Sequence, residues 1–69
     1  MPNYYVNRNA QSNGDHEVHT TTGCSNPANP ENRIALGNHL TCTTAVQKAR
    51  QYYSQVNGCY YCTKACHTT

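Results

Sequence analysis

The sequence predicts a small α+β domain with a β-hairpin, a short third strand, one α-helix and a C-terminal Cys-x-x-Cys knuckle. Three observations predict this fold class. An Asn-Gly turn signal separates two segments rich in Tyr, Val and Thr, and an apolar stripe with helical spacing follows later in the chain. The stretch "GCYYCTKACH", residues 58–67, then places three cysteines and a histidine close together. With 69 residues, the chain has room for one domain, residues 1–69.

The first predicted element is a β-hairpin over residues 3–22. Asn13-Gly14 is a strong hairpin turn signal, because both positions accept a positive φ. The flanking segments, "YYVNRNA" and "DHEVHTTT", contain residue types that favour strands. We therefore expect two antiparallel strands on either side of this turn.

A loop and a third strand follow. Residues 23–32, "GCSNPANPEN", contain a glycine and two prolines and are predicted to be a loop. Residues 33–37, "RIALG", are predicted to be a short strand of the same sheet. Ile34 and Leu36 are two residues apart, so they should lie on one face of that strand.

The pattern then changes to that of a helix over residues 41–56. Apolar residues recur there at steps of three and four, at Ala45, Val46, Ala49, Tyr52, Tyr53 and Val56. A threonine among residues 41–44 is expected to cap the start of the helix. Asn57-Gly58 is expected to cap its end, because glycine enters the left-handed conformation at little cost.

The chain has few strongly apolar side chains for a core. Its Val, Ile and Leu residues number seven, and Phe and Trp are absent. A domain of this size buries only about 60% of the surface of its unfolded chain. Below roughly 70–80 residues, disulfides or a structural metal usually supply the missing stability. We therefore expect a crosslink or a metal ion to hold the fold together.

Cys59 and Cys62 form a Cys-x-x-Cys pair after a glycine, and such a tight turn presents both sulfurs to one tetrahedral zinc ion. The segment "HTTTGC" offers His19 and Cys24 as the second half of the site. Thioredoxin-like redox chemistry is disfavoured, because the pair is predicted to follow a helix C-terminus rather than to begin a helix. A disulfide to Cys24 is the remaining alternative.

Two further residues compete for a ligand position. If a helical turn follows the knuckle, Cys66 falls on the same side as Cys59 and Cys62, and His67 is adjacent to it. Cys66 and His67 are therefore alternative ligands. Cys42 is expected to be a small buried apolar residue, and His39 is expected to be exposed.

Composition also limits the expected location and partners. No basic segment followed by an apolar run begins the sequence, and no stretch approaches the ~20 apolar residues of a membrane span. A cytoplasmic location, where thiols stay reduced and clustered cysteines bind metals, is the resulting expectation, and no membrane partner is expected. The formal net charge is +2. The five basic residues are dispersed, so charge does not argue for nucleic-acid binding.

The order of these features resembles the Ada-type metal-binding domain, the small zinc module at the N-terminus of a bacterial DNA-alkylation repair regulator. The matching features are His19-x4-Cys24, a proline loop, "ENRIALG", a helix and Gly58-Cys59-x2-Cys62. The likeness covers residues 19–62. It implies a zinc site formed by His19, Cys24, Cys59 and Cys62.

The chain departs from that family pattern in several places. The spacing from His19 to Cys24 is one residue longer, the helix is longer, no proline precedes Cys59, and "ACH" is added after the knuckle. In the repair protein, one zinc-bound cysteine accepts a methyl group from DNA. That activity is not carried over here, because no basic surface for DNA is evident.

The six tyrosines occur as three adjacent pairs, Tyr4-Tyr5, Tyr52-Tyr53 and Tyr60-Tyr61. We expect one tyrosine of each pair in the core and the other at its rim, with Tyr60 and Tyr61 shielding the metal from water. Bases can stack on exposed rings, which keeps nucleic acid as a second partner class.

The sequence therefore predicts a stand-alone zinc-binding module with a structural Zn²⁺ ion, which is not an enzyme and whose partner is a protein. One alternative is a secreted, disulfide-stapled effector or antimicrobial peptide. The other is an alkyl-acceptor or redox protein that acts through Cys24 or through Cys59 and Cys62.

Overall fold

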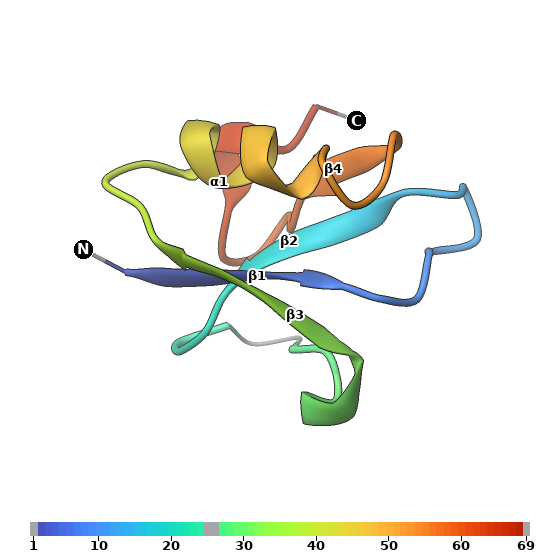
Figure 1. Ribbon diagram of the computed structural model, residues 1–69, viewed down its shortest axis with the longest axis horizontal. Coiled ribbons are helices and arrows are strands. Elements are labelled where there is room, and N and C mark those ends of the chain that lie inside the picture. Colours follow the sequence, from blue (N-terminus) through green and yellow to red (C-terminus); the bar gives the residue numbers. More distant parts are fainter. Residues whose placement is uncertain (1, 25–26, 69) are drawn as a thin grey trace.

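The computed structural model describes residues 2–24 and 27–68 and shows a four-stranded mixed sheet with one α-helix across one face (Figure 1). The strand order is β3-β1-β2-β4. The elements are β1 (Asn3–Asn7), β2 (His16–Thr20), β3 (Arg33–Asn38), α1 (Cys42–Ala49) and β4 (Val56–Gly58), with short 3₁₀ turns at Pro30–Asn32 (η1) and Lys64–Cys66 (η2). The predicted α+β fold class is confirmed. The described part of the chain contains no helix that is long and apolar enough to cross a membrane.

The predicted hairpin and third strand are confirmed. β1 pairs antiparallel with β2, and Val6 lies opposite Val18. Gly14 adopts a φ of 91° in the connection, whereas Asn13 does not have a positive φ. This connection spans residues 8–15 and is therefore longer than a two-residue turn. β3 pairs antiparallel with the other edge of β1.

The helix is shorter than predicted, and its predicted C-cap is wrong. α1 ends at Ala49, turns follow, and Val56 begins β4, which runs parallel to β2. The positive φ angles in the described chain belong to Gly14, Gly23 and Gly37, so Gly58 does not end a helix. The apolar stripe gave a wrong helix end because Val56 packs against the core from strand β4. A helix that extended to Val56 would have brought it to the same core.

The core lies between α1 and the facing side of the sheet. Its buried members are Tyr4, Val6, Val18, Leu36, Cys42, Ala45, Val46 and Ala49. Ile34 packs against this cluster beside Leu36, as their spacing predicted. Apart from Tyr4, these side chains are small or of medium size, and each buried Val or Leu contributes about 1.5–3 kcal/mol relative to exposure. The opposite face of the sheet has no comparable apolar layer among the described residues.

A disulfide joins the start of the helix to η2, which corrects two expectations. Cys42 is buried, as expected, but it is bonded to Cys66 rather than being a free apolar residue. The Cα atoms of the pair are 6.2 Å apart. Cys66 is therefore removed from the set of candidate metal ligands.

Candidate metal centre

Four side chains from three separate segments meet on the sheet face opposite α1: His19, Cys24, Cys59 and Cys62. Val18 and His19 are successive residues of β2, so one enters the core and the other points to the far face. Cys24 comes from the loop after β2. Cys59 and Cys62 come from the knuckle after β4. Their ligand atoms all lie within 4.8 Å of one another, so the cluster can hold a metal ion.

The distances within the cluster match the edges of a tetrahedron around one metal ion. The Cys24 sulfur lies 3.5 Å from Nδ1 of His19 and 3.7 Å from the Cys59 sulfur. The Cys62 sulfur lies 3.6 Å from the same Nδ1 atom. Metal–sulfur bonds of about 2.3 Å and metal–nitrogen bonds of about 2.0–2.1 Å give tetrahedral edges of about 3.8 Å between sulfurs and about 3.6 Å between sulfur and nitrogen. These three distances are therefore already at ligand spacing, and all four donor atoms lie within 4.8 Å of one another.

His19 is held in the neutral form that a metal ligand needs. Burial, and secondly the charge of Arg33, lower the pKa of its imidazole to about 4. The Tyr5 ring stacks on the imidazole, with 5.1 Å between ring centres. The other ring nitrogen, Nε2, lies 3.5 Å from Oε1 of Glu17. This distance is longer than a normal hydrogen bond, and it places the carboxylate where it can orient a metal-bound histidine.

The backbone supports negative charge on the sulfurs. The N–H groups of Tyr61 and Thr20 donate to the sulfurs of Cys59 and Cys62, each at 3.4 Å. Burial raises the pKa of the Cys59 thiol. Burial also acts to raise the pKa of Cys62, but hydrogen bonds from Cys24 and from the Thr20 N–H outweigh it, and that pKa is lowered. Such amide contacts stabilise thiolates around bound metals.

Arg33 and Tyr5 fix the loop that follows Cys24. The guanidinium carbon of Arg33 lies 4.5 Å from the centre of the Tyr5 ring. Nε and Nη2 of Arg33 donate to the Ala28 carbonyl at 3.1 and 2.9 Å. The Ala28 N–H donates to the Tyr5 hydroxyl at 3.0 Å. The stack of guanidinium, phenol and imidazole thus ties β3, β1, the loop and β2 together.

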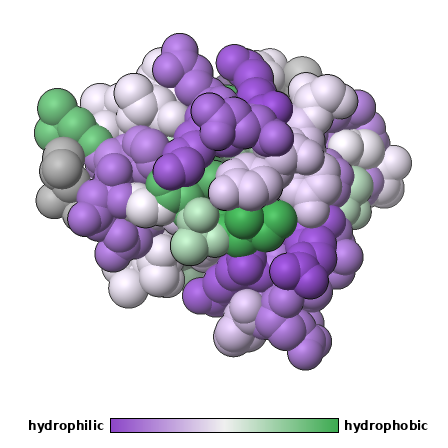
Figure 2. All heavy atoms as spheres, viewed as in Figure 1, coloured by the Kyte–Doolittle hydropathy of each residue, from purple (hydrophilic) through white to green (hydrophobic). Residues whose placement is uncertain are grey.

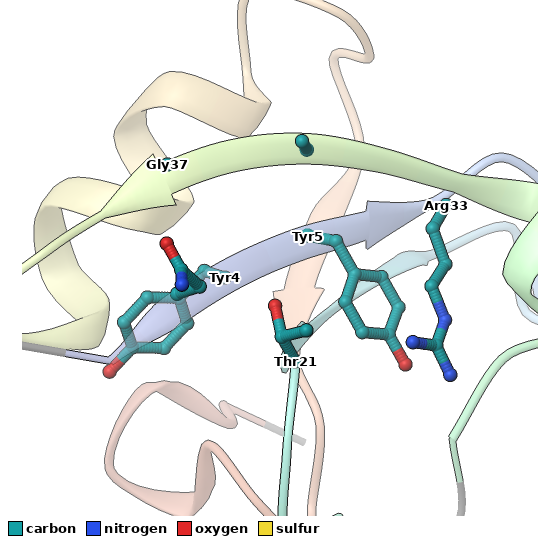
Figure 3. Close-up of a pocket in the computed structure, with 7 residues that line it drawn as sticks. Tyr4, Tyr5, Thr21, Arg33 and Gly37 are labelled. Atoms are coloured by element: carbon teal, nitrogen blue, oxygen red, sulfur yellow. The ribbon is translucent and has the colours of Figure 1, made fainter.

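These supporting residues were not identified from the sequence. Glu17 could have been found, because it is two residues before His19 and so shares its face of the strand. Tyr5 lies opposite His19 on the neighbouring strand β1, and Arg33 lies on β3, one strand further away. Their contact with the site depends on strand register, which no local motif specifies. A shallow cavity of about 230 Å³ lies beside them, and its lining includes Tyr4, Tyr5, Thr21 and Arg33 (Figure 3).

The knuckle itself is fixed to β2. The Cys59 N–H donates to the Val18 carbonyl at 2.9 Å. The buried Thr63 hydroxyl donates to the same carbonyl at 2.6 Å and lies 3.1 Å from the carbonyl of Cys59. Gly58 is needed for close approach, because a Cβ atom there would lie 2.7 Å from the Thr63 carbonyl oxygen and 2.8 Å from the carbonyl carbon of Cys66.

The other histidines lie outside the candidate metal centre. His67, the second alternative ligand, lies outside the cluster, and its Nδ1 forms a hydrogen bond with the Gly58 carbonyl at 2.9 Å. His16 stacks on Tyr53, which packs against the core, with ring centres 3.6 Å apart. His39, expected to be exposed, is half-buried and contacts Thr44 and the Leu36 carbonyl.

Two of the tyrosine pairs differ from the expectation, whereas in the third Tyr53 packs against the core and Tyr52 is exposed, as expected. Tyr4 and Tyr5 are both buried, on opposite faces of the sheet. Tyr60 and Tyr61 are 51% and 63% exposed, so neither of them lies in the core, contrary to what was expected for one tyrosine of each pair. The surface in Figure 2 is mostly hydrophilic, with a small hydrophobic patch near the middle over the β3 side.

Comparisons with protein-family models, curated proteins and solved structures found no match.

Gly58→Ala should displace the knuckle, because overpacking of this kind typically costs about 1–3 kcal/mol and neither backbone neighbour can rotate away. Urea unfolding of the metal-loaded protein measures the loss, and metal competition measures the weakened site. Gly37→Ala is the matched control, since its Cβ would meet nothing within 4 Å, only the positive φ adds strain, and Gly37 lies in β3 outside the cluster. Equal metal affinity in the Gly58→Ala variant and the wild type would contradict this role of Gly58.

Proposed function

We propose that this protein is a small zinc-stabilised binding module, not an enzyme, in which one structural Zn²⁺ ion holds the C-terminal knuckle against the sheet. The observation that supports it is the tetrahedral spacing of three sulfurs and one imidazole nitrogen. Sulfur-rich tetrahedral sets favour zinc over magnesium or calcium, which prefer oxygen ligands. Four protein ligands also leave no open position for substrate, which supports a structural ion.

Charge balance supports the same donor set. A divalent ion with three thiolates and a neutral imidazole carries one net negative charge, and the Arg33 guanidinium lies just behind Tyr5. When bound, the ion joins the loop after β2 to the knuckle after β4. The Ada-type resemblance proposes these four ligands independently of the geometry, and we retain membership of that family as a proposal.

The first test is metal content. We expect native mass spectrometry of the protein as isolated to show one bound zinc ion, because apparent binding free energies in comparable peptides are about 10–16 kcal/mol. A strong chelator should collapse the amide dispersion in NMR spectra, and Cys62→Ser should do the same without chelator. A compact, metal-free protein with an unchanged spectrum would refute the proposal.

Glu17→Gln should weaken zinc binding by about 10- to 100-fold, the usual effect of removing a carboxylate behind a metal-bound histidine. Competition with a chromophoric chelator measures the affinity. Glu31→Gln is the matched control, because Glu31 is exposed at η1 and outside the cluster. If both variants bind zinc as tightly as the wild type, Glu17 has no role in orienting His19.

The knuckle also supplies a candidate recognition surface. Tyr60 and Tyr61 meet edge to face, with ring centres 5.5 Å apart, and His67 packs edge-on to Tyr60 at 5.4 Å. The Lys64 ammonium lies 5.3 Å from the Tyr60 ring centre. Residues 58–68 contain no Asp or Glu. Tyrosines that are rigid and exposed are typical anchors of protein interfaces, so we propose an acidic protein segment as the partner.

Selection of random 12-residue peptides on the zinc-loaded protein tests this surface. The selected peptides should be rich in Asp and Glu, and Tyr60→Ala or Tyr61→Ala should weaken their binding by more than about tenfold. Tyr52→Ala is the matched control, because Tyr52 is 49% exposed and lies outside the knuckle. Peptides that bind the Tyr60→Ala and Tyr61→Ala variants as well as the wild type would show that recognition occurs elsewhere.

A further inference from the structure

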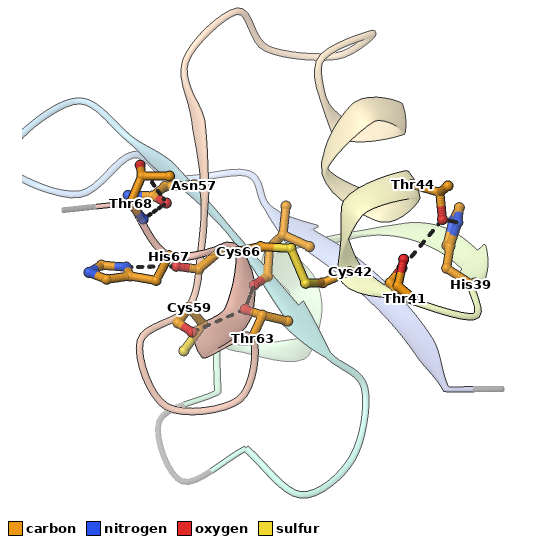
Figure 4. The surroundings of a disulfide bond; sticks show 12 residues. His39, Thr41, Cys42, Thr44, Asn57, Cys59, Thr63, Cys66, His67 and Thr68 are labelled. Atoms are coloured by element: carbon orange, nitrogen blue, oxygen red, sulfur yellow. Dashed lines mark hydrogen bonds between the residues drawn. A yellow bond between two sulfur atoms is a disulfide. The ribbon is translucent and has the colours of Figure 1, made fainter.

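The five cysteines of this chain occupy two settings. Cys42 and Cys66 form a disulfide on the helix side of the sheet, where Cys42 belongs to the core and Cys66 packs against it. The other three cysteines lie in the candidate metal centre. Figure 4 shows the Cys59 sulfur pointing away from the disulfide. A disulfide requires an oxidising stage in the life of the protein, in contrast to the reduced compartment expected from the sequence.

Oxidation without metal has competing products. The sulfurs of Cys24 and Cys59 lie only 3.7 Å apart. When no metal ion is bound to them, they are therefore placed to form a disulfide with each other. Cys59 and Cys62 form a Cys-x-x-Cys pair, a spacing that closes readily into a small disulfide ring. Either product would remove ligands from the metal centre.

The position of Cys66 depends on a formed knuckle. Its backbone N–H donates to the Thr63 carbonyl at 2.9 Å, and the Thr63 N–H donates to the Cys59 carbonyl at 2.9 Å. Its Cβ would lie 2.9 Å from a Cβ built on Gly58, so Cys66 lies directly against the residue before Cys59. A knuckle that is closed around a metal ion therefore places Cys66 next to Cys42.

We propose that the metal ion directs disulfide formation in this protein: it binds first, occupies Cys24, Cys59 and Cys62, and leaves Cys42 and Cys66 as the pair that is oxidised. This inference rests on the proposed zinc site. The Cys42–Cys66 pair is thus an oxidative modification site whose selectivity comes from metal occupancy and not from the reactivity of its thiols.

The oxidation balances with glutathione disulfide as the oxidant. The thiolate of Cys42 or Cys66 attacks one sulfur of glutathione disulfide, which forms a protein–glutathione mixed disulfide and releases one glutathione thiolate. The thiolate of the other cysteine then attacks the protein sulfur of the mixed disulfide and releases a second glutathione. The protein loses two hydrogens, and the oxidant gains them as two glutathione thiols. The zinc–sulfur bonds do not change.

The test compares two samples of reduced, metal-free protein that are oxidised with glutathione disulfide, one after addition of one equivalent of zinc. Bound zinc is first confirmed by native mass spectrometry, free thiols are then blocked with N-ethylmaleimide, and bridges are mapped by peptide mass spectrometry. The zinc sample should contain Cys42–Cys66 as its main bridge. The metal-free sample should contain bridges that include Cys24, Cys59 or Cys62, which zinc should suppress by about tenfold or more.

Two controls separate this inference from the zinc proposal. Zinc-loaded Cys42→Ser should end as a mixed disulfide between Cys66 and glutathione, with its other three cysteines unbridged. A bridge among those three in the zinc-loaded variant would overturn the inference. Identical bridge mixtures with and without bound zinc would overturn it too, but would leave the zinc site intact. Failure of the wild-type protein to bind the added zinc would overturn both proposals.

Discussion

The junction between residues 19–24 and residues 59–62 is the constraint on which the rest of this structure depends. The helix side of the sheet has an apolar core, whereas the far side carries the two loops that supply the clustered His and Cys side chains. A structural zinc ion contributes about 10–16 kcal/mol in comparable peptides, which is as large as the whole net stability of a typical domain, about 5–15 kcal/mol. An ion at this junction would therefore decide whether the far side of the sheet is ordered.

The junction is supported by residues outside it as well as by its own backbone N–H groups. Arg33, Tyr5 and His19 form a stack that begins at the edge strand and ends at the cluster. Because Tyr5 also accepts a hydrogen bond from Ala28, one side chain positions both the imidazole and the loop that follows Cys24. The stack also brings positive charge near a site that gathers negative charge. Geometry and electrostatics thus favour the same arrangement.

The sequence predicts the hairpin, the third strand and the clustered side chains because each follows from a local rule: a turn signal, an alternation and a short motif. The prediction of the helix end is wrong because Tyr53 and Val56 fit the apolar stripe of a helix. In the structure they pack against the core from a turn and a strand instead. The Cys42–Cys66 disulfide was not predicted, for another reason. Its two cysteines are 24 residues apart, and only the packing of η2 on the helix start brings them together. The roles of Tyr5 and Arg33 likewise depend on strand register, which a single sequence does not specify.

The parallel pairing of β4 with β2 has a consequence for synthesis. Val18 pairs with Gly58, which is made much later by the ribosome, and contacts of such long sequence separation form slowly. During translation at about 5–20 residues per second, His19 and Cys24 emerge well before their partners. The nascent chain therefore exposes half of the candidate centre, with an open edge on β2, until the knuckle residues have left the exit tunnel.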